Sequence, residues 1–268
     1  MWTNELEVAK ECVVLAGYEI MKIYQDEELF NVEYKTNNTP LTAADKASNK
    51  AIIEILHSEF PEYAILSEEE QDNLERLNND FCFVVDPLDG TKEFIKRNGQ
   101  FTVNIALSYK HHSEMGVIFV PATGELYFAS KGNGSYLIED GYKWFKNNKI
   151  ANIRRLSVSN RAADLRCVMS SSHGCAQMDA LINDNDITNI IKIGSSLKGC
   201  LIAKGDAEIY YRFNPTMEWD TAAMQCIVEE AGGFLRQIDN SDMTYNREDS
   251  CNRKGFYIIN IEENQLLN

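Results

Sequence analysis

The feature that most constrains the fold is a short apolar run that ends in a paired acidic motif. Residues 81–85 (FCFVV) are apolar throughout, which is typical of a buried strand. Residues 86–91 (DPLDGT) follow directly, and residues 92–95 (KEFI) continue as a short helical run. Pro87 fixes its own φ, and Gly90 tolerates a left-handed backbone. The pattern therefore predicts a strand, a tight turn and a helix.

This turn offers ligands for a cation and for a phosphate at one place. Asp86 and Asp89 are three residues apart, so their carboxylates can converge on one point. Carboxylate and carbonyl oxygens suit Mg²⁺, which often bridges protein carboxylates and substrate phosphates. Thr91 and the amides after it begin a helix, where an anion binds well. The alternative is an Asx-turn in which Asp89 only caps the helix, and the strand–turn–helix context makes it less favoured.

Three further acidic sites have ordinary structural explanations when each is taken alone. Residues 67–70 (SEEE) resemble a solvated surface run. Asp45 stands three residues after Thr42, as in a helix capping box. Asp220 opens a predicted helix and is explained by an N-cap, while residues 222–223 (AA) are small enough to let another backbone approach. The chemical interpretation depends on these sites acting together.

The first half of the chain is predicted to be α+β. One helix is expected over roughly 4–29, with Asn4 and Glu7 as a capping pair, and a second is expected to begin at Thr42. A strand over 101–109 precedes three turn signals, which predict an antiparallel meander with an Asp-Gly hairpin turn at its end. These turn signals lie at 121–124, 132–134 and 140–141.

The second half is predicted to alternate strands and helices, as in α/β proteins. The predicted strands span 166–170, 188–193, 207–213 and 256–261. The predicted helices span 175–184, 195–204 and 220–231. Gly205 and residues 232–233 (GG) stand where helix C-caps belong. Because the seam near 147–156 is not rich in Gly or Pro, residues 1–150 and 151–268 are expected to pack as one catalytic unit.

Charge and composition exclude several classes of partner. The net charge of −15 argues against nucleic-acid binding, because phosphate neutralisation supplies most of that affinity. The same charge repels small anions unless the site carries positive charge of its own. The sequence has no run of 18 or more apolar residues, so we expect no segment to span a bilayer. The N-terminus lacks the features of a signal peptide. The seven cysteines form no CxxC pair, so we expect reduced thiols and a cytoplasmic location.

Together, the four acidic sites resemble the inositol monophosphatase superfamily of metal-dependent, lithium-sensitive phosphatases. The resemblance runs nearly end to end, as far as residues 256–259. The motifs that match the superfamily's metal motifs are 66–69 (LSEE), 86–94 (DPLDGTKEF) and 219–223 (WDTAA). Within the superfamily, the chain looks most like the CysQ-type branch of 3′(2′),5′-bisphosphate nucleotidases. The segments that carry this finer resemblance are 92–95 (KEFI), 194–198 (GSSLK), 211–213 (YRF) and 215–219 (PTMEW).

The resemblance implies a layered αβαβα sandwich that holds two or three Mg²⁺ ions between its halves. The implied metal ligands are Glu68, Asp86, the carbonyl of Leu88, Asp89 and Asp220. Glu68 is preferred to Glu69 because it is the first acid after the small residue. The residues implied to hold and deprotonate the attacking water are Asp45, Thr91 and Glu68. So many carboxylates cannot lie close together in ionised form without cations, and the metals would make a positive site on an acidic protein.

The implied reaction removes the 3′-phosphate of adenosine 3′,5′-bisphosphate to give AMP, with the 5′-phosphosulfate analogue as a further substrate. The implied substrate contacts are Glu68, Leu88, Asp89, Gly90, Thr91, His173, Ser196, Lys198, Arg212 and Asp220, with Ser195 as the alternative to Ser196 at the start of the next helix. The structural alternatives at three of these positions are an N-cap serine, a surface lysine and a surface arginine. The chain departs from the branch at Ser171, near His173, where arginine is usual, and at Arg253, where proline is usual.

Two other functions remain open from sequence. An inositol or sugar phosphate monophosphatase of the same fold would need no cation at Lys198 or Arg212. A non-catalytic metal-binding or nucleotide-binding protein would not need the full acidic set. For the leading interpretation we expect a small phosphorylated nucleotide as ligand and no nucleic acid. We also expect a monomer or homodimer, in the cytoplasm or peripherally at the inner face of the membrane.

Overall fold

Two large β-sheets form the framework of the structure, a computed structural model that describes residues 2–26, 32–34, 40–72, 74–171 and 174–267. The first sheet has seven strands in the order β3-β4-β5-β6-β7-β8-β9. Their bounds are β3 Ala64–Ser67, β4 Phe81–Asp89, β5 Thr102–Tyr109, β6 His112–Phe119, β7 Leu126–Ser130, β8 Gly134–Ile138 and β9 Ile153–Arg155. β3 runs parallel to β4, and every later neighbour is antiparallel. The predicted meander is therefore confirmed from β5 to β8.

The second sheet has five strands in the order β11-β10-β12-β16-β14 and mixes parallel with antiparallel pairs. Their bounds are β10 Arg166–Ser170, β11 Asn189–Ile193, β12 Ile209–Arg212, β14 Phe234–Gln237 and β16 Phe256–Ile259. Two small ribbons complete the strands: β1 Val32–Tyr34 with β2 Pro40–Thr42, and β13 Thr216–Met217 with β15 Cys251–Asn252. The sequence predicted β10, β11, β12 and β16 but missed β14 and both ribbons.

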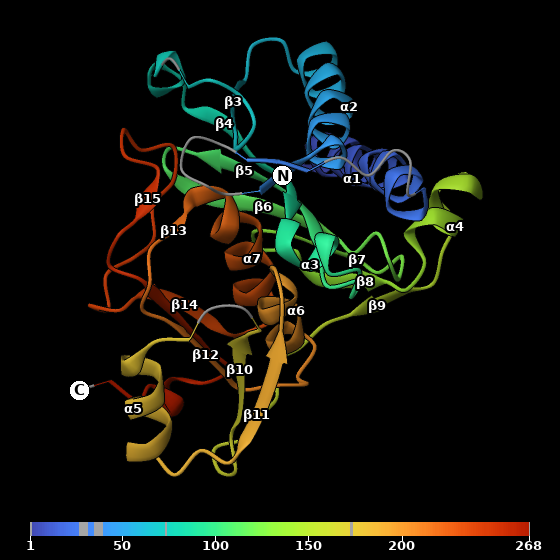
Figure 1. The fold of residues 1–268 in the computed structure, drawn as a ribbon. Coiled ribbons are helices and arrows are strands. Elements are labelled where there is room, and N and C mark those ends of the chain that lie inside the picture. Colours follow the sequence, from blue (N-terminus) through green and yellow to red (C-terminus); the bar gives the residue numbers. More distant parts are fainter. Residues whose placement is uncertain (1, 27–31, 35–39, 73, 172–173, 268) are drawn as a thin grey trace.

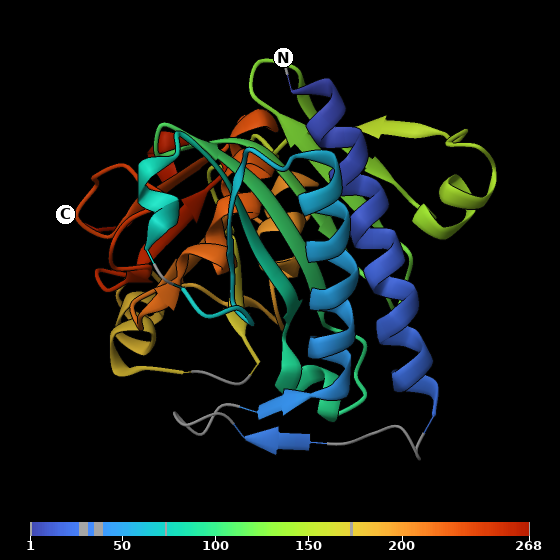
Figure 2. The same ribbon diagram turned by 90° about the horizontal axis from the view of Figure 1, so that it is seen from above.

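The helices complete five layers in the order αβαβα (Figure 1). Their bounds are α1 Thr3–Gln25, α2 Ala43–Glu59, α3 Thr91–Ile95, α4 Gly141–Lys146, α5 Ala176–Asp184, α6 Leu197–Ala203 and α7 Glu218–Glu230, with 3₁₀ turns η1 Glu75–Asn78 and η2 Glu262–Asn264. α1 and α2 lie side by side on the outer face of the first sheet (Figure 2). α6 and α7 lie between the sheets, and α5 covers the far face of the second. The predicted sandwich is confirmed.

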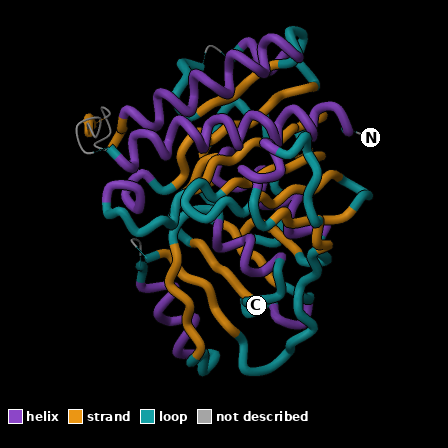
Figure 3. The backbone as a smooth tube through the Cα atoms, turned by 90° about the vertical axis from the view of Figure 1, so that its right-hand side faces the viewer, coloured by secondary structure: helices purple, strands orange, loops and turns teal. Residues whose placement is uncertain are grey.

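Side chains that alternate between the two faces of each strand fill the space between these layers. Phe83 and Val85 belong to the cluster under α1 and α2, whereas Cys82 and Val84 belong to the cluster around α6 and α7. A third cluster joins α5 to the second sheet. The backbone of these elements lies at one end of the stack (Figure 3). Since successive side chains of a strand point to opposite faces, one apolar run serves two cores. This is why residues 81–85 are apolar without interruption.

Local capping patterns predicted some boundaries correctly and others wrongly. The capping box at Thr42 is confirmed, because its hydroxyl accepts from the Ala44 amide and its own amide donates to Asp45. The Asn4–Glu7 cap is wrong: α1 begins at Thr3, after Trp2, and no side chain caps it. The helix ends at Gln25, so residues 27–29 of the predicted span lie outside the described residues.

The predicted hairpin turn at Asp140 and Gly141 is also wrong. The Asp140 carboxylate accepts from the Lys143 amide at 2.8 Å and caps α4. The Gly141 amide donates to the Gly124 carbonyl at 2.7 Å. An Asp-Gly pair serves a helix N-cap as well as a type I′ turn, and here tertiary contacts select the cap.

Two further observations bear on the sequence-based expectations. All seven cysteines are free thiols, and five of them are buried. None of the helices in the described part of the chain is long and apolar enough to cross a membrane.

α7 approaches the first sheet unusually closely, as the small residues at 222–223 predicted. A Cβ built on Gly116 of β6 would lie 2.4 Å from the Ala223 carbonyl oxygen and 2.9 Å from its Cα. The Ser113 hydroxyl donates to the Ala222 carbonyl at 2.7 Å. The backbone of α7 therefore contacts the backbone of β6 directly. This contact fixes the position of Asp220, which lies one helical turn before Ala223.

Gly116→Ala should lower the free energy of unfolding by about 1–3 kcal/mol, because the added methyl group meets backbone that cannot rotate away. Gly174→Ala is the control, since a Cβ there has no neighbour within 4 Å. We expect the control to stay within about 0.5 kcal/mol of wild type. Urea unfolding of the three proteins measures both values, and equal stability of the two variants would contradict the packing argument.

Candidate metal centre and phosphate cleft

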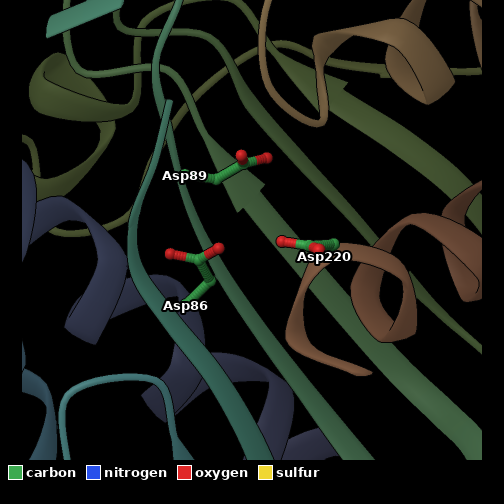
Figure 4. A group of neighbouring side chains, drawn as sticks. All are labelled: Asp86, Asp89 and Asp220. Carbon is green, nitrogen blue, oxygen red and sulfur yellow. The ribbon is translucent and has the colours of Figure 1, made fainter. Parts of the chain in front are cut away.

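Three carboxylates meet where the first sheet faces α7. Asp86 and Asp89 lie at the end of β4, and Asp220 lies in the first turn of α7. One oxygen of each lies within 4.8 Å of the other two. Figure 4 shows the three side chains pointing toward one another from two different elements. The convergence predicted for the first pair is present, and α7 adds the third member.

The local backbone explains how two carboxylates of one strand face the same point. The pairing of β4 with β5 shifts register between Asp86 and Asp89. Gly90 then takes φ 95°, in the left-handed region, and α3 begins at the next residue. The Ser48 hydroxyl donates to the Pro87 carbonyl at 2.6 Å and anchors the turn to α2. Asp89 ends a strand and Gly90 is the N-cap, so the simple capping alternative for Asp89 is wrong.

Each of these carboxylates is oriented by hydrogen bonds. Asp86 accepts from the Leu88 amide at 3.1 Å. Asp89 accepts from the Ser196 hydroxyl at 2.7 Å, and that hydroxyl accepts from Asn104 at 2.9 Å. Asp220 accepts from the Met217 amide at 2.7 Å, and the N-cap of α7 is Met217 rather than Asp220. The plain N-cap alternative for Asp220 is therefore wrong as well.

Burial and mutual repulsion make this cluster unfavourable as three bare anions. Asp86 is 1% exposed, and burial, together with Glu68, Asp89 and Asp220, raises its pKa well above the usual range. Burial and Asp89 raise the pKa of Asp220 to about 7. Crowded carboxylates of this kind are stabilised by a cation, and their hard oxygen atoms suit Mg²⁺. The residues present thus fit a metal centre.

Glu68 joins the same cleft from β3. Its amide donates to the Val85 carbonyl at 3.2 Å, which extends the pairing of β3 with β4 by one residue. Among the described residues, Glu68 lines the cleft and Glu69 does not. The preference for Glu68 over Glu69 therefore agrees with the geometry. The solvated-run explanation holds for Glu70, which is exposed.

Asp45 serves the helix cap and the site together. One of its carboxylate oxygens accepts from both the amide and the hydroxyl of Thr42, at 2.7 and 2.6 Å. The other accepts from the Thr91 hydroxyl at 3.2 Å, which also lies 3.4 Å from the Leu88 carbonyl. Burial raises the pKa of Asp45, and nearby Glu68 adds to this effect. The capping explanation is correct, and it places a carboxylate directly behind Thr91.

Two cationic side chains line the same cavity, of about 260 Å³, as the acidic cluster. Lys198 is 8% exposed, and its Nζ donates to the Ser195 carbonyl at 2.5 Å. Burial lowers the pKa of Lys198, while Asp89 opposes that shift. Arg212 also lines the cavity, and its Nε is buried without a hydrogen-bond partner. The surface-lysine alternative is wrong, and Arg212 offers an unused donor to an anion.

The cleft gathers nearly every site residue predicted from sequence. Those that line it are Glu68, Asp86, Leu88, Asp89, Gly90, Thr91, Ser196, Lys198, Arg212 and Asp220. Asp45 lies behind Thr91, and His173 lies outside the described residues. The Ser196 hydroxyl makes no helix cap and instead holds Asp89.

Sequence reasoning missed several residues of the site. Asn104 supports Ser196 and is 1% exposed. A lone amide inside an apolar strand is a signal that could have identified it. Glu93 also lines the cleft. Ser195, the sequence-based alternative to Ser196, lines it as well and takes a left-handed φ of 50° beside Gly90. Nothing in the local sequence indicates that strain.

Curated relatives cover almost the whole chain. "3′(2′),5′-bisphosphate nucleotidase CysQ" from Buchnera aphidicola is 38% identical over 260 residues, which are 96% of this chain and 94% of the relative. The protein of the same name from Escherichia coli K12 is 36% identical over 244 residues, which are 91% of this chain and 94% of that one.

A solved structure and a family model agree with these relatives. The crystal structure of CysQ from Bacteroides thetaiotaomicron, described as a bacterial member of the inositol monophosphatase family, superimposes with a TM-score of 0.83. It shares 35% sequence identity, and the match covers 98% of this chain and 99% of that chain. The model described as "Inositol monophosphatase family" matches residues 1–257. The chain therefore belongs to the inositol monophosphatase family.

Proposed function

We propose that the chain is a Mg²⁺-dependent 3′(2′),5′-bisphosphate nucleotidase that removes the 3′-phosphate of adenosine 3′,5′-bisphosphate to give AMP. The observation that carries the proposal is one cleft lined both by a carboxylate cluster and by two cationic side chains, Lys198 and Arg212. The names of relatives 36–38% identical to the chain support the same substrate class.

Asp86, Asp89 and Asp220 would hold the metal, together with Glu68 and the Leu88 carbonyl. This set supplies only hard oxygen ligands, and two or three Mg²⁺ ions would balance its charge. When bound, Mg²⁺ would supply positive charge to the phosphoryl oxygens and to the leaving oxygen. Because Asn104 and Ser196 fix Asp89, and Met217 fixes Asp220, the ligands are oriented before metal binds.

Thr91 and Asp45 would receive the proton of the attacking water. The water oxygen forms a bond to phosphorus while the bond between phosphorus and the ribose 3′-oxygen breaks, and the leaving 3′-oxygen takes a proton from solvent to become the hydroxyl of AMP. The water proton passes to Thr91 Oγ1 as the Thr91 proton passes to Asp45 Oδ1 along the existing 3.2 Å hydrogen bond. Burial makes Asp45 a stronger base than an ordinary aspartate, because it raises the pKa of the carboxyl group.

Lys198 and Arg212 would bind the second phosphate of the nucleotide. Both line the cleft beside Asp220 and Asp89, and Arg212 has a buried donor without a partner. A buried donor of this kind gains most from a charged acceptor. A simple monophosphate offers no such acceptor, which favours the bisphosphate over an inositol or sugar phosphate.

The seven free thiols support a cytoplasmic location.

Asp86→Asn and Asp220→Asn should each abolish hydrolysis without loss of the fold, because each removes one negative charge from the metal centre and leaves the apolar core unchanged. The pKa of Asp86 and that of Asp220 are raised in the folded protein. The stability that these groups contribute is therefore fully present below their unfolded pKa and is lost as pH rises through the folded pKa, which is about 7 for Asp220. At pH 8 without metal, each variant should therefore melt at a higher temperature than wild type.

Adding Mg²⁺ should raise the melting temperature of wild type and leave that of either variant nearly unchanged. Thermal melts at pH 8, with and without Mg²⁺, measure both effects alongside phosphate release. Near wild-type turnover in either variant at saturating Mg²⁺ would contradict the assignment of these ligands.

Lithium should inhibit the enzyme at millimolar or lower concentration. In an all-oxygen site, Li⁺ can occupy one Mg²⁺ position, but its single charge is too small to support turnover. Phosphate release is measured in LiCl against equal NaCl, which controls for ionic strength. Full activity in high lithium would count against this type of centre.

Arg212→Ala should reduce kcat/KM for adenosine 3′,5′-bisphosphate by roughly ten- to a hundredfold, because a charged hydrogen bond to phosphate contributes about 1.5–3 kcal/mol. It should leave kcat/KM for inositol 1-phosphate nearly unchanged. Arg253→Ala, an exposed arginine outside the cleft lining, is the control and should change neither value. Equal losses for both substrates in Arg212→Ala would place this arginine in the fold or in general catalysis.

A further inference from the structure

An ion pair between a fully buried carboxylate and a half-buried guanidinium lies close to Asp220, in α7 and the segment before β15. Glu218 is fully buried, two residues before Asp220. One carboxylate oxygen accepts from the amide and from Nε of Arg247, at 3.0 and 3.1 Å. The other accepts from the Asn246 amide at 2.6 Å. Neither Glu218 nor Arg247 is among the described residues that line the cleft, so the pair does not contact substrate.

A short chain of hydrogen bonds leads from Arg247 to the Asp220 carboxylate. The Arg247 guanidinium donates to the Asn252 side-chain oxygen at 2.6 Å. The Asn252 amide nitrogen donates to the Met217 carbonyl at 2.9 Å and to the Thr221 hydroxyl at 3.1 Å. The Met217 amide in turn donates to Asp220 at 2.7 Å. Met217 is thus held through its carbonyl while its amide orients the metal ligand.

The same segment is anchored to the first sheet by a second arginine. Arg76, in η1 after the acidic run, is 5% exposed. Its guanidinium donates to the Asn246 side-chain oxygen and to the Arg247 carbonyl, both at 2.8 Å. It also pairs with Asp72 at 2.7 Å. The segment that binds Glu218 is therefore tied to the 3₁₀ turn that follows Glu68 along the chain.

Stability alone gives no reason for this arrangement. Glu218 is fully buried, and the hydrogen bonds from Asn246 and Arg247 must offset the cost of taking its charge out of water. Removing two charges from water usually makes a buried ion pair no more stable than well-packed apolar side chains. Partners that orient metal ligands, by contrast, commonly change metal affinity when they are lost.

We propose that Arg247 and Glu218 are positioning residues that hold Asp220 in its ligand orientation and thereby set the affinity of the metal centre. This inference rests on the proposed function, because it requires a metal at Asp220. The two residues act through Asn252 and Met217 and touch neither substrate nor metal.

The chain contains a closely matched pair elsewhere. Glu208 is also fully buried, and it accepts from the amide and the guanidinium of Arg166. The Arg166 side chain is 29% exposed, against 28% for Arg247. Neither Arg166 nor Glu208 is among the described residues that line the cleft. Loss of this pair should affect stability without affecting the metal.

The test compares Arg247→Ala with Arg166→Ala. Melting temperatures in EDTA should fall in both variants. Calorimetric titration with Mg²⁺, without substrate, should show binding weakened by about 10- to 100-fold in Arg247→Ala and unchanged in Arg166→Ala. The Mg²⁺ concentration for half-maximal hydrolysis should rise in parallel, with kcat recovered at saturating Mg²⁺.

Equal Mg²⁺ affinity in wild type and Arg247→Ala would overturn the inference and leave the proposed function intact. Absence of Mg²⁺ binding by wild type would overturn the proposed function, and with it this inference. If Arg247→Ala does not fold, Glu218→Gln and Glu208→Gln provide the second comparison, since each keeps the shape of the side chain and removes its charge. Weaker Mg²⁺ binding in Glu218→Gln alone would support the inference, and equal binding in both would overturn it.

Discussion

Repulsion among buried carboxylates is the constraint on which the rest of this structure depends. Asp86, Asp89 and Asp220 come within 4.8 Å of one another at the meeting of a strand end and a helix start. Burial raises the pKa of Asp86 and Asp220, so the folded chain gives up stability to hold them there. That cost makes sense only if a cation joins the cluster, and the surrounding hydrogen bonds keep the ligands oriented for it.

Several residues serve the fold and the chemistry at once. Asp45 closes the capping box of α2 and stands behind Thr91. Gly116 of β6 and Ala223 of α7 bring helix backbone onto strand backbone, and Asp220 lies one helical turn before Ala223, where it meets Asp86 and Asp89. The structural and the functional role of these residues therefore coincide, because the structural contact is what locates the functional group.

Local sequence predicted most of the elements and about half of the residues that line the cleft. The predictions succeeded where the residues of one short segment are sufficient to form its structure, as in the apolar run before Asp86 or the capping box at Thr42. They failed where two local structures use the same residues. The Asp140–Gly141 pair serves a helix cap as well as a hairpin turn, and only the bond from Gly141 to Gly124 decides between them. Asn4 could cap a helix, but α1 begins one residue earlier.

The sequence by itself determined which residues can bind metal and phosphate, because carboxylates after a buried strand and hydroxyls at helix starts have that chemistry wherever they occur. Tertiary structure alone decided how they are held. Asn104 reaches Ser196 and Asp89 from a neighbouring strand, and Arg247 reaches Asp220 through a segment near the end of the chain. Such contacts join residues far apart in sequence, so no local pattern records them. They arise only when both sheets and the helices between them are packed.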